Sequence, residues 1–356
     1  MLDEVELGIK RTFLVTGGHG FLGQHLVKQA LIDPRLKPVI LDSVSALAPE
    51  GVEVIRADVR DLAQLRKIFR DLKPDFLVHA AAQLPRAEPE AIRATTVDGT
   101  RNILLLADEL EIERTIFVSS TAVYSQKGDG VHQEEEELAE GFGTYGRAKV
   151  VAERLCAEAR SRGQCVSVVR PKSFLGPGRM GVFQILFDWI LEGRRIPTIG
   201  DGSNRFQLLD VDDLCQAILV LLWADKASAN QAFNVGASEY DSVKSEIGNL
   251  CEYAGTGSRS FSIPVAPTHA LLSILYKVGL SPIYPWVFRT AATNSEVSVS
   301  RMASLGWSPK YSNTETLRRA FDWYRENRSN FEGVGDHTGH RAIWSQGALK
   351  LLKHLF

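Results

Sequence analysis

The sequence lacks the features that mark several classes of protein. Its four cysteines form no CxxC pair, which indicates buried thiols in a reduced, cytoplasmic protein, and no metal site is predicted. Lys and Arg are dispersed and the net charge is −2, so no nucleic-acid partner is expected. The longest apolar runs, such as 217–224, fall well below the ~18 residues that span a bilayer. Residues 1–10 lack the basic start and apolar core of a secretion signal. A soluble protein, at most peripheral to a membrane, is expected.

What the sequence does contain is a glycine turn between an apolar run and a helix. The run 12–16 is strand-like, Gly17, Gly20 and Gly23 stand three apart, and a helix is predicted over 21–32. This spacing lets backbone N–H groups approach a pyrophosphate and lets the helix pack closely on the strand. We interpret the stretch as a phosphate-binding turn that includes Phe21 and Leu22. An ordinary strand-to-helix connection is the alternative.

Acidic residues follow the next two predicted strands. Asp42 ends the strand 38–41 about 20 residues after the glycines, where a carboxylate can accept the hydroxyls of an adenosine ribose. It would repel a 2′-phosphate, which favours NAD over NADP; the alternative is a solvated turn residue. Asp58, followed by Val59, ends the strand 52–57. It can reach an adenine amino group or cap the helix that follows.

The order of elements predicts an α/β fold, a doubly wound parallel Rossmann-type sheet with a smaller, mainly helical C-terminal lobe. Strands alternate with helices of about 10 to 20 residues, which implies right-handed βαβ units. The strand 75–79 runs into Ala80, Ala81 and Ala82, whose small side chains let a cofactor approach the backbone. His79 is interpreted as structural. Ligands collect at the carboxyl ends of such strands.

Three further residues supply the chemistry of an acid/base catalyst. Tyr145 and Lys149 are four apart on the helix predicted over 144–161, so they share a face. A phenol ordinarily titrates near pH ~10, and a neighbouring ammonium and an oxidised nicotinamide both favour the phenolate. Lys149 can also hold the nicotinamide ribose. Ser120, after the strand 115–118, can donate a hydrogen bond to the substrate oxygen as hydride moves.

In this order the motifs resemble the extended short-chain dehydrogenase/reductase family, of the NAD-dependent epimerase/dehydratase type. The matching stretches, between about residues 12 and 328, are 16–23, Asp42, Asp58, 118–124, 145–149, 170–171, 176–178, 200–202, 211–213, 233–236 and 305–309. The resemblance implies NAD as cofactor, a small-molecule substrate, and Ser120, Tyr145 and Lys149 as the catalytic triad. It places Pro171, within the loop 170–178, beside the nicotinamide, and the substrate in the C-terminal lobe.

Several positions depart from the family pattern and bear on the substrate. Sugar-nucleotide members commonly carry Asn where this chain has Ser173. The position at which those members carry a diphosphate-binding Arg is occupied here by Phe206, and Arg205 stands one residue earlier. A shift of one residue turns a side chain to the other face of a strand. Ser173, Arg205, Ser120 and Thr121 are the predicted substrate contacts. Thr121 stands where 4,6-dehydratases have Asp, which disfavours dehydration, and Thr96 replaces a frequent Asn.

The predicted division of the chain follows these motifs. Residues 1–170 form the NAD-binding domain, to which 207–236 return; 171–206 and 237–330 form the substrate lobe; 331–356 form an amphipathic tail. The apolar stretch 263–288 is interpreted chiefly as lobe core, with a substrate pocket or membrane contact as alternatives. The tail is interpreted as a helix docked on its own domain, with a peripheral membrane helix or a dimer contact as alternatives. The acidic run 134–137 is interpreted as a solvated face.

The sequence leaves three functions open. The first, which we expect because sugar-nucleotide members are frequent in the family, is a nucleotide-sugar epimerase or reductase that works by tyrosine acid/base catalysis and hydride transfer. The second is a dehydrogenase or reductase of an apolar hydroxy or keto substrate, similar to 3β-hydroxysteroid dehydrogenases, which the displaced Arg205 and the apolar lobe favour. The third is a non-catalytic NAD-binding scaffold or redox sensor, against which Ser120, Tyr145 and Lys149 argue. A homodimer is expected.

Overall fold

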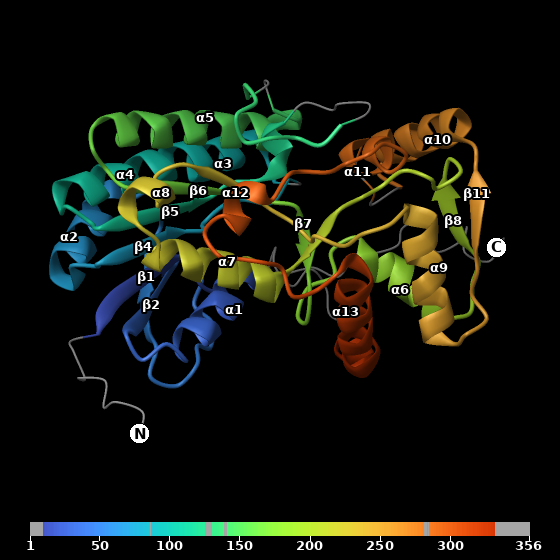
Figure 1. The fold of residues 1–356 in the computed structure, drawn as a ribbon, viewed down its shortest axis with the longest axis horizontal. Helices are drawn as coiled ribbons and strands as arrows, with labels where there is room; N and C mark the ends of the chain where they lie inside the picture. Colours follow the sequence, from blue (N-terminus) through green and yellow to red (C-terminus); the bar gives the residue numbers. More distant parts are fainter. Residues whose placement is uncertain are drawn as a thin grey trace.

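The computed structural model describes residues 10–85, 87–124, 130–138, 141–280, 283 and 285–331. Seven parallel strands form one sheet in the order β10-β6-β5-β4-β1-β2-β3 (Figure 1). The strands are β1 (Arg11–Thr16), β2 (Leu36–Asp42), β3 (Glu53–Arg56), β4 (Phe76–His79), β5 (Arg114–Val118), β6 (Val166–Pro171) and β10 (Ala232–Val235). The order runs outward from β1 in both directions, so the predicted doubly wound sheet is confirmed.

Helices cover both faces of this sheet (Figure 1). One layer holds α1 (Phe21–Ala30) and α7 (Val211–Trp223); the other holds α2 (Leu62–Leu72), α4 (Gly99–Glu109) and α5 (Gly143–Ser161). Before α4 lie α3 (Pro89–Arg93) and a π-helical turn, Ala94–Asp98. Side chains of β1 alternate between the layers, since Phe13 and Val15 join the core cluster of α1 and α7 while Leu14 joins that of α2 and α4. The carboxyl ends of the strands therefore stay open for a site.

A smaller lobe is built after β6. Strand β7 (Ser173–Leu175) pairs with β9 (Leu208–Asp210), and β8 (Ile196–Ile199) pairs with β11 (Ser260–Ile263). The lobe's helices are α6 (Phe183–Leu191), α9 (Val243–Ala254), α10 (Val265–Lys277), α11 (Pro285–Thr290) and α13 (Asn313–Asn327). Its core gathers Phe187, Phe321 and Tyr324. The remaining short elements are α8 (Lys226–Ala229), α12 (Ser300–Ala303) and the 3₁₀ turns Thr121–Val123 and Arg328–Phe331.

Most predicted elements lie within two residues of the observed ones, but the interpretation of 263–288 as lobe core holds only in part, since Leu272 and Phe288 are buried in that core and most of α10 is not. Within α10 only Leu272 is buried, because the helix lies at the outside of the lobe instead of between its layers. All four cysteines are buried and free, as predicted. The predictions for the C-terminal tail concern residues that lie beyond 331, outside the described part of the chain. In that described part, no helix is long and apolar enough to cross a membrane.

Candidate active site

The glycine turn brings the end of β1 into direct contact with the end of β4. Gly17 has φ +71°, and a Cβ there would lie 2.8 Å from the backbone N and Cα of Ala81. The N–H of Gly20, which begins α1, donates to the Gly17 carbonyl oxygen at 2.9 Å. A Cβ on Gly23 would lie 2.5 Å from the Gly18 Cα. Only glycine therefore fits Gly17 and Gly23, and the turn presents bare backbone at the amino end of α1.

Replacing Gly17 with alanine is expected to weaken NAD binding by tenfold or more, because the new methyl group forces the turn away from Ala81. The matched control is Gly51→Ala, which also places a side chain at positive φ (+80°) but meets no atom within 4 Å. In both variants a non-glycine residue in a left-handed backbone conformation destabilises the fold by about 1–2 kcal/mol. The two variants should therefore differ only in their affinity for NAD. Calorimetric titration with NAD measures it. Equal affinities for the two variants would contradict the role given to the turn.

Asp42 and Asp58 lie at the carboxyl ends of neighbouring strands. The Asp42 carboxylate accepts the His19 N–H and the Val44 N–H, each at 3.0 Å, so it is tied to the glycine turn. Asp58 forms an ion pair with Arg60 at 2.6 Å, and this hydrogen bond lowers the pKa of Asp58. The alternative that Asp58 caps α2 is wrong, since Asp61 accepts the Gln64 N–H instead.

The alanines after β4 and the histidine before them are fixed by one threonine. The Ala80 N–H donates to the Thr16 carbonyl oxygen at 3.1 Å, and the Ala81 N–H donates to Thr16 Oγ1 at 3.4 Å. His79 is buried, with its ring nitrogens 2.7 Å from Thr16 Oγ1 and 3.1 Å from Thr100 Oγ1. Burial, assisted by the Lys149 charge, lowers the pKa of His79 from 6.5 to about 3. His79 is thus held as a neutral hydrogen-bonding residue.

Acid is expected to destabilise the protein through His79. Because its pKa is lower in the folded state than in the unfolded chain, the stabilisation is fully present above pH 6.5 and is lost as the pH falls toward 3. The loss is at most about 1.4 kcal/mol per pH unit. Urea unfolding between pH 7 and pH 5 should show a shallower pH dependence for His79→Gln than for the wild type. Identical slopes would count against this source of acid sensitivity.

The three predicted catalytic residues meet at the end of β5. Lys149 is 2% exposed, and its Nζ donates to the Val118 carbonyl oxygen at 2.7 Å, two residues before Ser120. The same Nζ lies 5.8 Å from the centre of the Tyr145 ring, one helical turn earlier on α5. Ser120 Oγ accepts the Ala122 N–H at 3.1 Å. Burial lowers the pKa of Lys149 to about 8, so its ammonium is still protonated at neutral pH.

A buried ion pair that the sequence analysis missed supports this site. Glu153, one turn beyond Lys149, accepts two-pronged hydrogen bonds from Arg170, with Nη2 to Oε2 at 2.6 Å, and both side chains are about 95% buried. Ser119, next to Ser120, donates to the same carboxylate at 2.5 Å. Arg170 also donates to the Tyr124 hydroxyl at 2.8 Å. The pair therefore joins α5, β5 and β6 next to the predicted catalytic residues.

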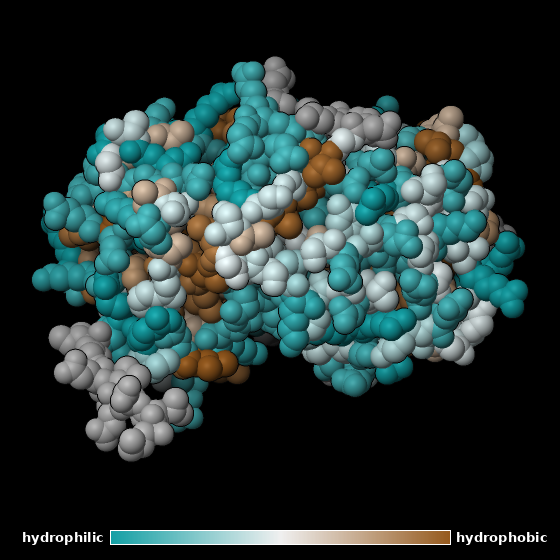
Figure 2. All heavy atoms as spheres, viewed as in Figure 1, coloured by the Kyte–Doolittle hydropathy of each residue, from teal (hydrophilic) through white to brown (hydrophobic). Residues whose placement is uncertain are grey.

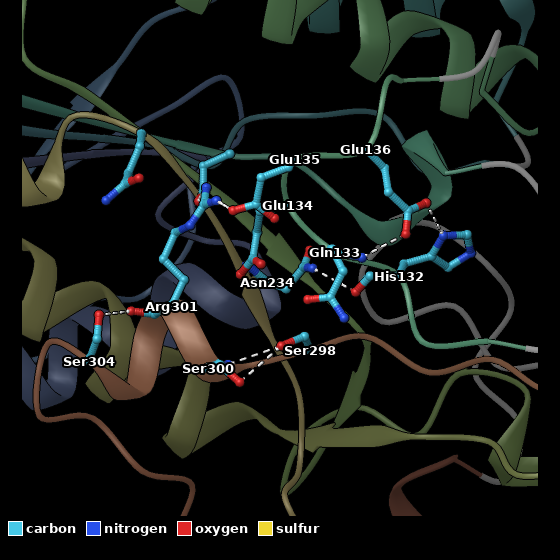
Figure 3. A network of polar contacts seen from close by, with 12 residues as sticks. His132, Gln133, Glu134, Glu135, Glu136, Asn234, Ser298, Ser300, Arg301 and Ser304 are labelled. Carbon is cyan, nitrogen blue, oxygen red and sulfur yellow. Dashed lines mark hydrogen bonds and ion pairs between the residues drawn. The ribbon is translucent and has the colours of Figure 1, made fainter.

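The acidic run after Ser120 is only partly the predicted solvated face: Glu135 and Glu137 are exposed, whereas Glu134 and Glu136 are bound into the fold. Glu134 is buried and accepts the Asn234 N–H at 3.0 Å, and Glu136 contacts His132 Nδ1 at 2.8 Å. Glu135 forms an ion pair with Arg301, and Figure 3 shows the two side chains pointing toward one another. These contacts fasten the segment 130–138 to β10 and α12. The partners of Glu134 and Glu135 lie 100 and 166 positions away along the chain, so local charge patterning does not reveal them.

A protein-family model described as the NAD dependent epimerase/dehydratase family matches residues 13–236. The chain belongs to this family. The resemblance drawn from the motifs is therefore confirmed, the chain is of the extended short-chain dehydrogenase/reductase type, and its cofactor is NAD. Members of the family are NAD-dependent enzymes.

The relatives of this family member are chemically diverse. Protein y4nG of Sinorhizobium fredii is 33% identical over 97% of this chain and 86% of its own length. A dTDP-glucose 4,6-dehydratase of Streptomyces niveus is 25% identical over 90% of this chain and 94% of its own. A 3beta-hydroxysteroid-dehydrogenase/decarboxylase of Arabidopsis thaliana is 25% identical over 87% of this chain and 58% of its own length. The fold also matches a Thermotoga maritima UDP-glucose 4-epimerase with a TM-score of 0.72 and 23% sequence identity. The match covers 89% of this chain and 99% of the epimerase.

The residues at the turn fit NAD. Both ring nitrogens of His19 are buried without a hydrogen-bond partner among the described residues, so the turn holds polar atoms that the fold alone does not satisfy. No described side chain caps the amino end of α1. The glycine turn would hold the pyrophosphate, Asp42 the adenosine ribose, and Asp58 the adenine end, where it lines an open recess with Arg56 and Gln64. When bound, NAD accepts or supplies the hydride.

The predicted substrate residues lie at the boundary between the sheet and the lobe. Thr121 begins the 3₁₀ turn after Ser120, and Ser173 begins β7; both are half-buried. Arg205 is half-exposed, with Nε 3.4 Å from the Glu296 carboxylate. The sequence analysis missed Lys172, which is buried and donates to Ser295 Oγ at 2.6 Å. In the described part of the chain, no cluster of three or more His, Cys, Asp or Glu residues has the geometry of a metal site.

Proposed function

We propose that this protein catalyses the NAD-dependent interconversion of a secondary alcohol and a ketone, with Ser120, Tyr145 and Lys149 as the catalytic residues. The observation that carries the proposal is the buried Lys149 ammonium, held against the end of β5 on the face of α5 that also bears Tyr145. A protonated Lys149 favours the phenolate of Tyr145 by its charge. In oxidation the Tyr145 phenolate takes the proton of the substrate alcohol as hydride leaves the carbon, and in reduction the neutral Tyr145 phenol gives that proton to the substrate oxygen.

Ser120 is suited to bind that oxygen. Its Oγ already accepts the Ala122 N–H, so the hydroxyl hydrogen remains for donation to the substrate. A donor fixed at the point where negative charge develops on oxygen lowers the barrier without reorganising during the reaction. The Glu153–Arg170 pair keeps β5 and α5, and with them Ser120 and Tyr145, at a constant separation.

For the substrate, we propose an apolar hydroxy or keto compound without a diphosphate. Arg205 is the predicted diphosphate ligand, and the Glu296 carboxylate together with the Tyr240 carbonyl oxygen, 3.2 Å from Nη2, already bind its guanidinium. A diphosphate at Arg205 would have to bind beside the Glu296 carboxylate, whose negative charge repels it. The sterol-dehydrogenase relative supports the same substrate class.

The second candidate is a nucleotide sugar, with epimerisation or reduction at a ring carbon. It is supported by the half-exposed Arg205, which can exchange partners more readily than a buried residue, and by the dTDP-glucose dehydratase relative. A cytoplasmic location, a homodimer and the division of the chain into an NAD-binding domain and a substrate lobe accompany either candidate as proposals.

A substrate panel tests these alternatives. Nucleotide sugars and hydrophobic hydroxy or keto compounds are incubated with the enzyme and NAD or NADH, with NADH followed by absorbance and the products identified by mass spectrometry and chromatography. The proposal predicts an equimolar change in NADH with apolar substrates only. An isomerised sugar without net NADH change would establish the second candidate instead.

A further inference from the structure

Helix α10 leaves most of its apolar side chains in solvent. Leu271, Ile274 and Val278 are 49%, 60% and 60% exposed, and their spacing of three and four residues places them on one side of the helix. Figure 2 shows a small group of hydrophobic residues at the upper right, where α10 lies, among hydrophilic ones. A contiguous apolar surface of this kind marks an interaction site, whereas single exposed apolar residues do not.

This exposure is concentrated in one part of the chain. Six of the sixteen large hydrophobic side chains that are exposed in the described part of the protein fall between residues 265 and 280. They are Val265, Leu271, Ile274, Tyr276, Val278 and Leu280; of these, Leu271, Ile274 and Val278 share one side of the helix, and we call these three the α10 face. The concentration shows that the α10 face is a local feature and not the general apolar background of a protein surface.

The charges around the α10 face are of one sign. No Asp or Glu occurs from residue 253 to residue 295, although an even spread of the chain's 43 acidic residues would place about five there. Arg259, Lys277 and Arg289 lie in this stretch and are exposed. Arg195 adds a further cation, since its guanidinium lies 4.5 Å from the ring centre of Phe261, on the strand that precedes α10. The chain segment that carries the face is therefore basic as well as apolar.

We propose that the α10 face binds the surface of an anionic lipid bilayer. The apolar side chains would enter the boundary between headgroups and acyl chains while the Lys and Arg residues meet the anionic headgroups, as in other helices that lie in a membrane interface. A second copy of the chain fits less well, because pairing two α10 faces would oppose charges of the same sign. The segment 339–356 fits no better, since it carries Arg341, Lys350 and Lys353 and no acidic residue.

Sedimentation with lipid vesicles tests the proposal on the full-length protein and needs no catalytic activity. The vesicles are phosphatidylcholine alone, or phosphatidylcholine with phosphatidylglycerol at about a third of the lipid, where anionic headgroups attract basic segments. The wild type should bind the anionic vesicles at least about tenfold more strongly than the vesicles of phosphatidylcholine alone. Ile274→Glu with Val278→Glu should abolish that binding. The matched control, Ile32→Glu with Leu47→Glu, adds the same charge at exposed apolar sites elsewhere and should bind like the wild type.

Unchanged thermal unfolding of both double variants establishes that they are folded. The proposal is overturned if the α10 variant binds anionic vesicles like the wild type, or if the wild type binds neutral vesicles equally well. Two further results would assign the face to another occupant and also overturn the proposal. One is a wild type that forms a dimer by light scattering but does not bind vesicles, together with an α10 variant that is monomeric. The other is vesicle binding that depends only on residues 339–356.

Discussion

Replacing Tyr145 with phenylalanine is expected to lower turnover by about 10²- to 10⁴-fold, because the variant has no group to exchange a proton with the substrate oxygen. NAD affinity should change little, since the ring remains on α5 and the glycine turn is untouched. Steady-state kinetics in the direction that the substrate panel identifies, together with calorimetric titration of NAD, measure the two quantities on the same sample.

The control for this substitution is Tyr253→Phe. It removes the same atom from a tyrosine on α9 whose hydroxyl donates to Asp322 at 2.6 Å at the protein surface. Turnover of the control should equal that of the wild type. If Tyr145→Phe retains full turnover, Tyr145 is not the acid/base. If a biological role of the protein survives the loss of turnover, the scaffold or redox-sensor alternative gains support.

The largest expected effect on stability comes from the buried ion pair beneath the site. Arg170→Met leaves the Glu153 carboxylate buried without its cation and is expected to cost about 3–5 kcal/mol in the free energy of unfolding. Urea denaturation at neutral pH measures this cost. Adding Glu153→Gln to Arg170→Met should restore part of the stability, because the remaining side chain is then neutral.

A surface pair with the same two-pronged geometry is the matched control. Arg66 donates to Glu109 at 2.9 and 2.7 Å, but both side chains are about one-third exposed. Arg66→Met should therefore cause a much smaller loss than Arg170→Met, since water solvates the carboxylate that is left. Similar losses for the two variants would contradict the importance given to burial.

The sequence predicted those parts of the fold and site that depend on backbone geometry. Gly17 and Gly23 must be glycine because the turn, β4 and α1 approach so closely, and Asp42 and Ser120 occupy strand ends that the alternation of strands and helices already defines. Tyr145 and Lys149 share a helix, so their spacing alone predicts that they are neighbours. Such features are encoded locally or by topology.

The parts that the sequence did not predict depend on side-chain partners distant in the chain. Glu296 lies 91 residues after Arg205, and Asn234 lies 100 residues after Glu134, so no local pattern reveals either contact. Glu153 is on α5, the helix of Tyr145 and Lys149, but its partner comes from β6. The apolar composition of α10 predicts burial as readily as exposure, because only the packing of the lobe decides which helix lies outermost.

The central claim, net transfer of hydride between NAD and the substrate, is tested most directly by isotope labelling. The enzyme is incubated with NADH that carries deuterium at the transferable position and with the ketone that the substrate panel identifies, and the product is analysed by mass spectrometry. The account predicts one deuterium on the carbon of the new alcohol in the wild type and a strongly reduced rate of labelling in Tyr145→Phe. A product that forms at the wild-type rate without deuterium would contradict it and would indicate isomerisation or another chemistry.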